Sequence, residues 1–382
     1  MDPFLPATLG PLTVRNRIIK AATFEGRSPK RTVTPDLVEF HRRIAAGGVG
    51  MSTVAFCAVS LDGTTDGHQL VLTDDAVPGL RTLTDAIHGE GAAAAAQIGH
   101  AGPVANVRGV PALAPSAMVT PALKRARAAT EDDLDRVVGA FAAGAKRLAE
   151  AGFDALEVHM GHNYLISAFL SPRLNRRRDR WGGPLDNRAR LARRVARAVR
   201  EAAPALAVTA KLNMADGVRG GLDVDESLAV AGMLRDDGTL DALELTVGSS
   251  LANPMFLFRG PPPRREFAAT LPPVLRPGFA VAGRFLFRNY PFEEAYLRPL
   301  ARRFLAEVRM PLILLGGINR LDTIRDALGE GFAFVAMARA LLREPDLVNR
   351  MREGAASAAT CVHCNKCVPT IYRRTRCALD DP

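Results

Sequence analysis

The sequence predicts an α/β protein, a (β/α)8 TIM barrel with a long loop after strand six and a cysteine-rich C-terminal tail. Eight short apolar runs alternate along the chain with the periodic patterns of amphipathic helices. The turn after the first run, Ala-Ala-Thr-Phe-Glu-Gly at 21–26, lacks the Gly-x-Gly-x-x-Gly pattern of a doubly wound sheet. With 382 residues and 48% hydrophobic content, the chain is long enough for one barrel-sized domain.

The helices between the predicted strands begin at recognisable caps. Thr34 precedes Pro35 at the first turn of one helical pattern, and Thr130 begins a capping box with Asp133 before a long amphipathic run to Ala151. In chain order, the eight strands are expected at residues 17–23, 48–59, 92–98, 155–159, 207–212, 242–247, 311–315 and 332–337.

Two segments exceed a simple barrel. Residues 249–292 follow the sixth strand, are rich in proline, glycine and aromatic residues, and are far longer than a usual connection. Active sites of such barrels lie where the strands end, so we expect this segment to form a lid or a substrate wall. The chain is thus divided into a barrel at 1–354 and an extension at 355–382, which carries four of the five cysteines.

The residues best suited to chemistry lie at the end of the fourth strand, in Glu157-Val-His159-Met-Gly161-His162-Asn-Tyr164. Gly161 lets the chain leave the strand, so that His159 and His162 can face one pocket with Tyr164 beside them. Two imidazoles and a phenol suit the stabilisation of a developing oxyanion and the delivery of a proton. These three are the predicted catalytic residues; the alternative is a pair of structural histidines.

The ends of strands seven and eight predict a phosphate site. Gly316-Gly317 and Ala338-Arg339 fall where barrels commonly bind phosphate through backbone amides and a nearby cation. Arg339 is the predicted phosphate ligand. This site, with polar groups on other strands, would suit flavin mononucleotide (FMN).

Two polar residues on other strands fit the flavin ring. Gln97 ends an alanine-rich strand and suits the polar edge of a pyrimidine. Lys211 ends the fifth strand, where a positive charge would stabilise the negative charge that develops near N1 of a reduced flavin. A salt bridge between Lys211 and Glu157 or Asp216 is the alternative, and the two roles are compatible.

The tail carries Cys361, Cys364, Cys367 and Cys377 in the spacing C-x2-C-x2-C-x9-C. Thiolates at this spacing can bind a 4Fe-4S cluster or zinc, and three close cysteines with one distant cysteine favour iron–sulfur. Free thiols or a disulfide are the remaining alternatives. The expected absence of a signal peptide argues against an extracellular disulfide.

Seven segments together resemble one known family. They are Val14-Arg-Asn16-Arg17-Ile-Ile, Gln97-Ile-Gly-His100-Ala-Gly102, His159-Met-Gly-His162-Asn-Tyr164-Leu, Ser171-Pro-Arg-Leu-Asn175-Arg-Arg-Arg178-Asp179-Arg-Trp181-Gly-Gly183, Asn187-Arg188, Gly316-Gly317 and Ala338-Arg339. With these segments the chain resembles the Old Yellow Enzyme family of FMN-dependent ene-reductases over nearly its whole length.

This resemblance implies ping-pong chemistry with NADH or NADPH as the reductant. Hydride would pass from the nicotinamide to FMN and then to the β-carbon of an activated alkene, a small-molecule substrate. His159 and His162 would bind the carbonyl oxygen of the substrate, and Tyr164 would protonate its α-carbon. Ala22 and Thr23 would lie beside the flavin ring.

Several positions depart from the family pattern. Lys211 replaces the arginine of many members and loses its fork geometry. Asn163 replaces a glycine and Trp181 a tyrosine. Phe24 stands where relatives carry threonine, cysteine or histidine, and Phe56 where a small residue is common. The substrate pocket is therefore expected to differ in shape.

The cysteine tail resembles the branch of this family that includes 2,4-dienoyl-CoA reductase and trimethylamine dehydrogenase. That branch implies two alternative functions: an FMN-dependent amine dehydrogenase or demethylase, and a flavoprotein that passes electrons through a 4Fe-4S cluster to a protein partner. An amine site usually gathers several aromatic side chains round the cation. Of the four tyrosines, only Tyr164 is placed in the pocket by the sequence.

The net charge of +10 does not by itself indicate nucleic-acid binding. Basic residues are scattered and mixed with acidic ones, and arginine outnumbers lysine 44 to 6, which is typical of a solvated surface. The alanine run at 92–96 is too short to span a bilayer, and the N-terminus lacks a signal-peptide pattern. We expect a cytoplasmic enzyme that binds neither nucleic acid nor membranes; a homo-oligomer is compatible with the sequence.

Overall fold

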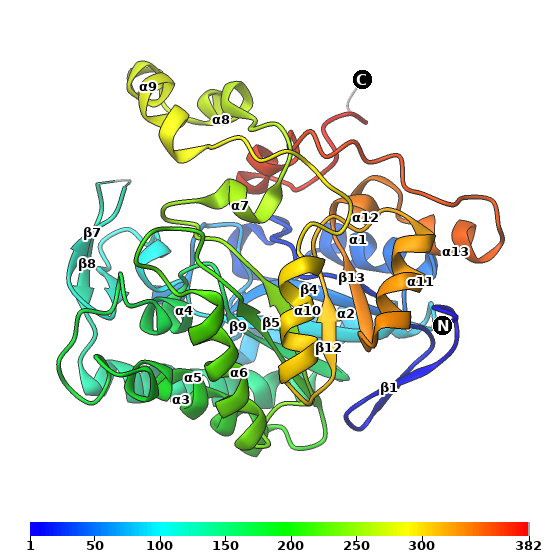
Figure 1. Ribbon diagram of the computed structural model, residues 1–382, viewed down its shortest axis with the longest axis horizontal. Coiled ribbons are helices and arrows are strands. Elements are labelled where there is room, and N and C mark those ends of the chain that lie inside the picture. The colour runs from blue at the N-terminus through cyan, green and yellow to red at the C-terminus, as the bar shows by residue number, and fades with distance from the viewer. Residues whose placement is uncertain (122, 381–382) are drawn as a thin grey trace.

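The computed structural model describes residues 1–121 and 123–380. Eight parallel strands close a barrel in chain order (Figure 1), and each of the eight predicted runs overlaps one of them. The predicted TIM barrel is therefore confirmed. The strands are β3 (Ile18–Lys20), β4 (Met51–Ala58), β5 (Ala93–Gly99), β9 (Ala155–Met160), β10 (Ala207–Asn213), β11 (Ala242–Thr246), β12 (Leu312–Leu314) and β13 (Phe334–Met337).

The helices that follow these strands pack around the barrel, and both predicted caps are present. The Thr34 side chain accepts a hydrogen bond from the backbone N–H of Leu37, and Thr130 forms the full capping box with Asp133. The helices are α1 (Pro35–Ala46), α2 (Val77–His88), α3 (Glu131–Glu150), α4 (Leu165–Leu170), α5 (Leu185–Ala202), α6 (Val224–Asp236), α10 (Arg298–Glu307), α11 (Leu321–Glu330), α12 (Arg339–Arg343) and α13 (Leu347–Arg352). Short 3-10 turns occur at η1 (Pro29–Arg31), η2 (Leu61–Gly63), η3 (Asp74–Ala76) and η4 (Gly102–Val104).

Two small sheets lie outside the barrel and were not predicted. An antiparallel hairpin of β1 (Ala7–Leu9) and β2 (Leu12–Val14) packs against the inward alanines at the start of the barrel strands. After β5, a second sheet forms from β6 (Ala112–Ala114), β7 (Met118–Val119) and β8 (Arg125–Ala128). Strands of two to four residues rich in alanine and arginine give no periodic signal, which explains why the sequence did not reveal them.

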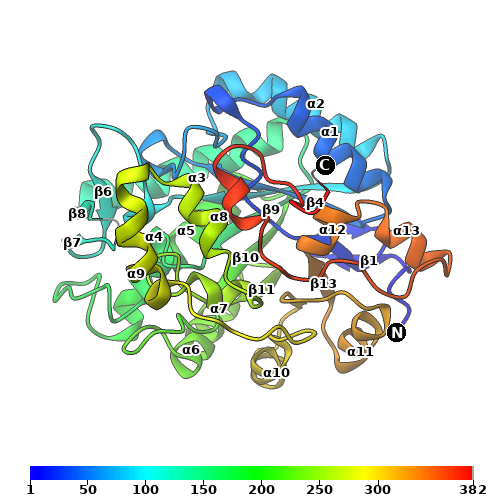
Figure 2. The same cartoon turned by 90° about the horizontal axis from the view of Figure 1, so that it is seen from above.

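The long segment after β11 is partly helical rather than a loop. It contains α7 (Pro254–Phe258), α8 (Arg264–Thr270), η5 (Pro273–Leu275) and α9 (Arg276–Leu286). The pair α8 and α9 projects from the end of the molecule where the barrel strands finish, and the C-terminal tail with η6 (Val368–Tyr372) lies beside α8 (Figures 1 and 2). Both segments that exceed the barrel therefore lie on its strand-end face.

Side-chain size along the strands explains where a site can form inside the barrel. Small inward residues fill the lower interior: Ala95, Ala155, Ala207 and Ala242. The polar side chains of Gln97, Glu157, Lys211 and Glu244 follow on the same four strands, nearer the strand ends. Within the described residues, no helix is both long enough and apolar enough to cross a bilayer.

Candidate active site

The three predicted catalytic side chains lie together. The His159 ring, at the end of β9, is centred 5.0 Å from the His162 ring and 4.7 Å from the Tyr164 ring. Both ring pairs meet edge to face. The structure thus brings together residues that are three and five positions apart in the chain.

The turn after β9 differs in one respect from the predicted one. The left-handed residues are His162 (φ 61°) and Asn163 (φ 58°), not Gly161. Gly161 is needed for close approach instead, because a Cβ there would lie 3.1 Å from Thr246 Cγ2 and 3.2 Å from Asn213 Oδ1. Glycine therefore allows the turn to pack against β10 and β11.

Neighbouring strands fix the orientation of His162. Its Nε2 lies 3.0 Å from Thr246 Oγ1 on β11, and its backbone N–H donates to Asn213 Oδ1 at 3.1 Å. His159 is held differently, since its Nδ1 is buried and has no hydrogen-bond partner among the described residues. Thr246 and Asn213 were not predicted; their position at the ends of β11 and β10, the two strands that follow β9 around the barrel, was the available signal.

Both imidazoles are neutral near pH 7. Burial and the nearby Lys211 cation together lower the pKa of His162 to about 3. Burial, His162 and Lys211 together hold the pKa of His159 well below its usual range. A neutral imidazole can donate one N–H to an oxyanion but has no second proton to give, so a proton donor must be another group.

An aromatic wall completes this side of the pocket. The Phe56 ring is centred 5.2 Å from Tyr164, 6.1 Å from His159 and 6.4 Å from Phe24. Ala22, Phe24 and Tyr164 pack against one apolar cluster, which includes Phe56. The segment after β3, expected to lie beside a flavin ring, therefore shares this wall with Tyr164. The sequence singled out Phe24 and Phe56 as departures that change the shape of the substrate pocket, but did not predict that Phe56 contacts Tyr164 and His159.

Lys211 forms the predicted salt bridge with one of the two carboxylates considered. Its Nζ lies 3.0 Å from Glu157 Oε1 and 2.6 Å from Glu244 Oε1, while Gln97 Nε2 donates to Glu157 at 2.7 Å. The prediction that Asp216 could be the partner of Lys211 is wrong, because Asp216 instead accepts hydrogen bonds from Ser171, Asn213 and the backbone of Leu222. Glu244 was missed; it is the register partner of Lys211 across β10 and β11.

The predicted phosphate site is formed by two glycines that follow β12 and one arginine that follows β13. Gly316 and Gly317 have φ values of 112° and 72°, and a Cβ on Gly317 would lie 2.6 Å from the Tyr296 ring. Arg339 donates to Asn365 Oδ1 and to the carbonyl of Arg259, the latter at 3.3 Å. Among the described residues it has no carboxylate partner, so its charge is available to a phosphate.

The four tail cysteines line one small cavity together with Arg339 and Arg343. Positive φ angles at His363 and Asn365 turn the chain between them. Burial raises the pKa of Cys361 and of Cys377, and raises that of Cys367 to about 11. No cysteine in the described part of the chain forms a disulfide, so that alternative is not present.

The cavity does not have the geometry of a single-ion site. No group of three or more His, Cys, Asp or Glu side chains within residues 1–121 and 123–380 is arranged to hold one metal ion. The two arginines beside the cysteines would favour thiolates, which are the ligands of an iron–sulfur cluster.

The tail is attached to the segment that follows β3. Thr375 donates from its backbone N–H to the carbonyl of Glu25 at 2.9 Å and from its hydroxyl to the carbonyl of Phe24. Arg27 donates to the Thr375 carbonyl at 2.9 Å. The cysteine cavity and the aromatic wall are thus connected by direct hydrogen bonds.

An aromatic cage lies in the region after β11 and contains a cation of the chain itself. The Arg259 guanidinium lies 5.2 Å from the centres of the Phe256 and Tyr290 rings and 5.6 Å from that of Tyr296. The aromatic residues that a bound amine would need are therefore already in contact with Arg259.

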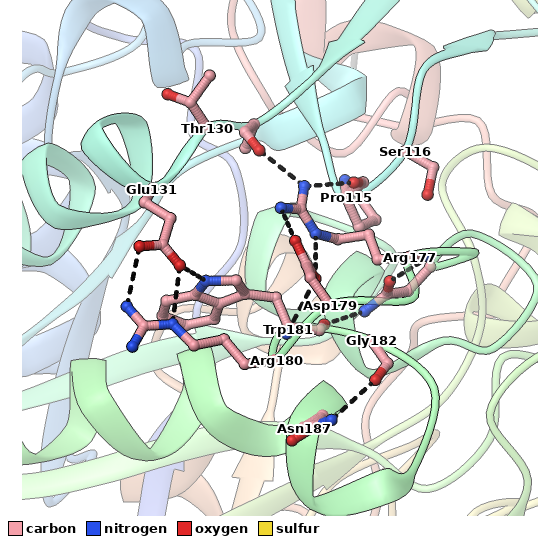
Figure 3. Close-up of polar contacts among 12 residues, drawn as sticks. Pro115, Ser116, Thr130, Glu131, Arg177, Asp179, Arg180, Trp181, Gly182 and Asn187 are labelled. Atoms are coloured by element: carbon pink, nitrogen blue, oxygen red, sulfur yellow. Dashed lines mark hydrogen bonds and ion pairs between the residues drawn. The ribbon is translucent and has the colours of Figure 1, made fainter.

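Residues 175–187, which carry much of the family resemblance, brace the scaffold (Figure 3). Arg177 donates to the carbonyls of Pro115 and Ala129 at 3.0 and 2.7 Å and forms an ion pair with Asp179 at 2.6 Å. The indole of Trp181 is fully buried, and its N–H donates to Glu131 at 3.0 Å. These contacts tie the loop before α5 to the small sheet and to α3.

Comparison with known proteins agrees with this geometry. The chain is 55% identical to 4,4'-dithiodibutanoate disulfide reductase from Rhodococcus erythropolis, over 99% of the chain and 95% of that protein. It is 32% identical to a metal reductase from Desulforamulus reducens, over 97% of the chain and 52% of that protein. The chain thus spans nearly all of the first relative and about half of the second.

Two solved structures share the fold. An old yellow enzyme homologue from Zymomonas mobilis matches with a TM-score of 0.77 at 22% identity, over 100% of this chain and 99% of that one. A complex of 2-naphthoyl-CoA reductase with 2-naphthoyl-CoA matches with a TM-score of 0.85 at 24% identity, over 98% of this chain and 56% of that one.

The family model described as NADH:flavin oxidoreductase / NADH oxidase matches residues 2–247. This match and the reductase relatives confirm the prediction of a flavin oxidoreductase that uses FMN and NAD(P)H. The chain belongs to the NADH:flavin oxidoreductase / NADH oxidase family.

Proposed function

We propose that this enzyme reduces a C=C bond conjugated to a carbonyl or related group, with hydride from NAD(P)H in a ping-pong reaction. The observation that carries the proposal is the convergence of His159, His162 and Tyr164, whose ring centres lie within 5.0 Å of His159. Two N–H donors and one O–H group in a buried pocket match the oxyanion and the proton that such a reduction requires.

The FMN-binding residues in this proposal come from five strand ends. They are Ala22, Thr23, Gln97, Lys211, Gly316, Gly317, Ala338 and Arg339. FMN, when bound, supplies a hydride at N5 after it has been reduced by NAD(P)H. Arg339 would hold the phosphate, and Gln97 and Lys211 would face the ring.

The chain's own residues perform the rest of the reaction. His159 and His162 donate hydrogen bonds to the substrate oxygen as it gains negative charge, and Thr246 keeps the His162 ring in position. Tyr164 gives its proton to the α-carbon. Phe24 and Phe56 exclude water on one side of the pocket, so that these hydrogen bonds act in a low-dielectric site.

The Tyr164→Phe variant tests the assignment of the proton donor. Loss of a positioned general acid is expected to reduce the rate of alkene reduction by about 10²–10⁴-fold. Reduction of the enzyme by NADPH should keep its normal rate, because that half-reaction does not use the phenol. Stopped-flow absorbance separates the two half-reactions with cyclohexenone as the alkene. Unchanged alkene reduction in this variant would show that the donor is another group.

An organic disulfide is the second candidate substrate. The relative from Rhodococcus erythropolis, 55% identical over nearly the whole chain, is named for reduction of 4,4'-dithiodibutanoate. Hydride addition to a disulfide releases one thiol and one thiolate, and the thiolate later binds a proton. A thiolate is a stable leaving group at pH 7–8, since the thiol pKa is about 8.5, so it needs no acid in the transition state.

The same variant distinguishes the two substrates. With 4,4'-dithiodibutanoate as the oxidant, Tyr164→Phe should retain most of its activity, while alkene reduction falls. Wild-type turnover of the disulfide at a far higher kcat/KM than that of any enone would make the disulfide the preferred substrate class.

We also propose that Cys361, Cys364, Cys367 and Cys377 bind a 4Fe-4S cluster. Their shared cavity and the two adjacent arginines support this assignment. Iron and acid-labile sulfide should be present in protein purified without oxygen and absent after Cys364→Ser. Zinc in their place would contradict it. An amine dehydrogenase is disfavoured, because Arg259 already fills the aromatic cage.

A further inference from the structure

Two carboxylates and one ammonium group lie inside the barrel below His159 and His162. Glu157, Lys211 and Glu244 are 4%, 2% and 2% exposed, and they project from β9, β10 and β11. Lys211 Nζ lies 3.0 Å from Glu157 and 2.6 Å from Glu244. The lysine therefore contacts both carboxylates at once.

The charges in this group do not balance. The neighbouring strand β5 contributes the neutral amide of Gln97, and β12 contributes Ile313, the register partner of Glu244. Towards the strand ends, His159 and His162 have lowered pKa values and are neutral. Full ionisation would leave one buried negative charge without a cation, which is costly. One bound proton makes the group neutral.

The contacts indicate which carboxyl group holds that proton. Glu157 Oε1 accepts hydrogen bonds from both Gln97 and Lys211, whereas Glu244 Oε1 contacts Lys211 Nζ, at 2.6 Å, and has no second donor among the described residues. Burial and the adjacent Glu157 charge raise the pKa of Glu244 to about 7. Because this pKa lies near 7, the pair holds the proton below neutral pH and releases it above, and a nearby charge shifts this balance.

We propose that Glu157 and Glu244 form a proton-binding site that takes up one proton when negative charge appears beside Lys211. The proposal rests on the proposed function, because hydride transfer from NAD(P)H supplies that charge. NAD(P)H leaves as NAD(P)⁺, two electrons and one proton remain as the hydride, and one further proton from solvent binds the carboxyl pair. When the hydride passes to the substrate, the carboxyl proton is released to solvent. Glu244 is thus a positioning residue that acts through Lys211.

The resting proton is tested on protein from which the flavin has been removed. Infrared spectra in H₂O and D₂O should show a protonated carboxyl band at pH 6 that disappears by pH 9, and Glu244→Gln should lack it. Asp216 is the matched control, because burial also raises the pKa of this carboxyl group. Asp216→Asn should keep the band. Absence of the band from the wild-type protein at pH 6 would overturn the proposal, whether or not the variant folds.

The coupling is tested on the flavin-loaded protein by potentiometric titration at several pH values. Above pH 7, the midpoint potential of the wild-type protein should fall more steeply with pH than that of Glu244→Gln. The difference between the two slopes should correspond to one additional proton bound per two electrons. Equal slopes in the two proteins would overturn the coupling while leaving the proposed function intact. Failure of the wild-type protein to bind FMN would instead contradict the proposed function, and the infrared result would stand separately.

Discussion

The protein buries two lysines at the barrel wall, and they differ in how their charge is matched. Lys20 on β3 points outward, with its Nζ 5.4 Å from the centre of the Phe40 ring on α1. This Nζ lies 2.7 Å from Glu25 in the loop after β3 and donates to the Thr53 carbonyl on β4 at 2.9 Å. Lys211 on β10 points inward and contacts two carboxylates. Both ammonium groups are 2% exposed, so burial is the same and only the number of partners differs.

The difference appears in the acids that pair with them. Burial opposes ionisation of Glu25, but Lys20 and His41 outweigh it and lower its pKa. His41 lies 3.3 Å from Glu25, and burial lowers its own pKa, so this group is one cation and one anion. Around Lys211 a second carboxylate raises the pKa of Glu244 instead. The balanced group supports structure, and the unbalanced group can exchange a proton.

Removal of Lys20 should have the largest effect on stability. Lys20→Met leaves Glu25 buried without its cation, and loss of one partner of a buried pair costs about 3–5 kcal/mol. Urea unfolding followed by circular dichroism measures the loss. Adding Glu25→Gln should recover part of it, because the uncompensated charge is then gone. A change below about 0.5 kcal/mol, the size of an ordinary surface substitution, would mean that the pair does not hold α1 on the barrel.

The two groups should also respond to pH in opposite directions. The pKa of Glu244 in the folded protein, about 7, lies above its ordinary value of 4.5. Its contribution to stability is therefore complete below pH 4.5 and is lost as the pH rises to about 7, by on the order of 3 kcal/mol. The pKa of Glu25 is lowered, so its contribution is present above pH 4.5 and is lost on acidification.

Chemical unfolding at pH 5 and pH 8 measures this contrast. Between these two pH values, the free energy of unfolding of Glu244→Gln should fall less than that of the wild-type protein. For Glu25→Gln, the pH dependence of the free energy of unfolding should differ from that of the wild-type protein only below pH 5. Identical pH profiles for Glu244→Gln and wild type would show that the second carboxylate does not retain a proton in the folded protein.

The sequence predicted the inward lysine better than the outward one, for a physical reason. Lys211 lies at the end of an apolar strand, where a local pattern identifies it, and Glu157 was correctly named as a partner. Asp216 was wrongly considered and Glu244 was missed, because the facing carboxylate depends on the register of β10 against β11. Glu25 and His41 meet Lys20 only through packing of a loop and a helix.

The same distinction applies to the fold and the site. Eight strands and two caps follow from periodicity and local side-chain bonds, and the sequence predicted them all. Thr246 faces His162 from another strand, so no local signal identified it, and Phe56 was singled out only through the family resemblance. The helices α8 and α9 were expected as loop, because proline and glycine near them hid their periodicity.

The smallest predicted effect concerns a neutral contact rather than a charged one. Thr246→Val removes the hydrogen bond that orients His162 and is expected to weaken transition-state binding by about 1 kcal/mol, roughly fivefold in kcat/KM. The loss should appear in kcat more than in KM, and Thr246→Ser should restore it. Thr209→Val is the matched control, since the Thr209 hydroxyl bonds only the Leu156 carbonyl on the neighbouring strand, at 3.3 Å. Equal losses in both variants would indicate a general effect on the barrel, because only Thr246 touches an imidazole of the catalytic group.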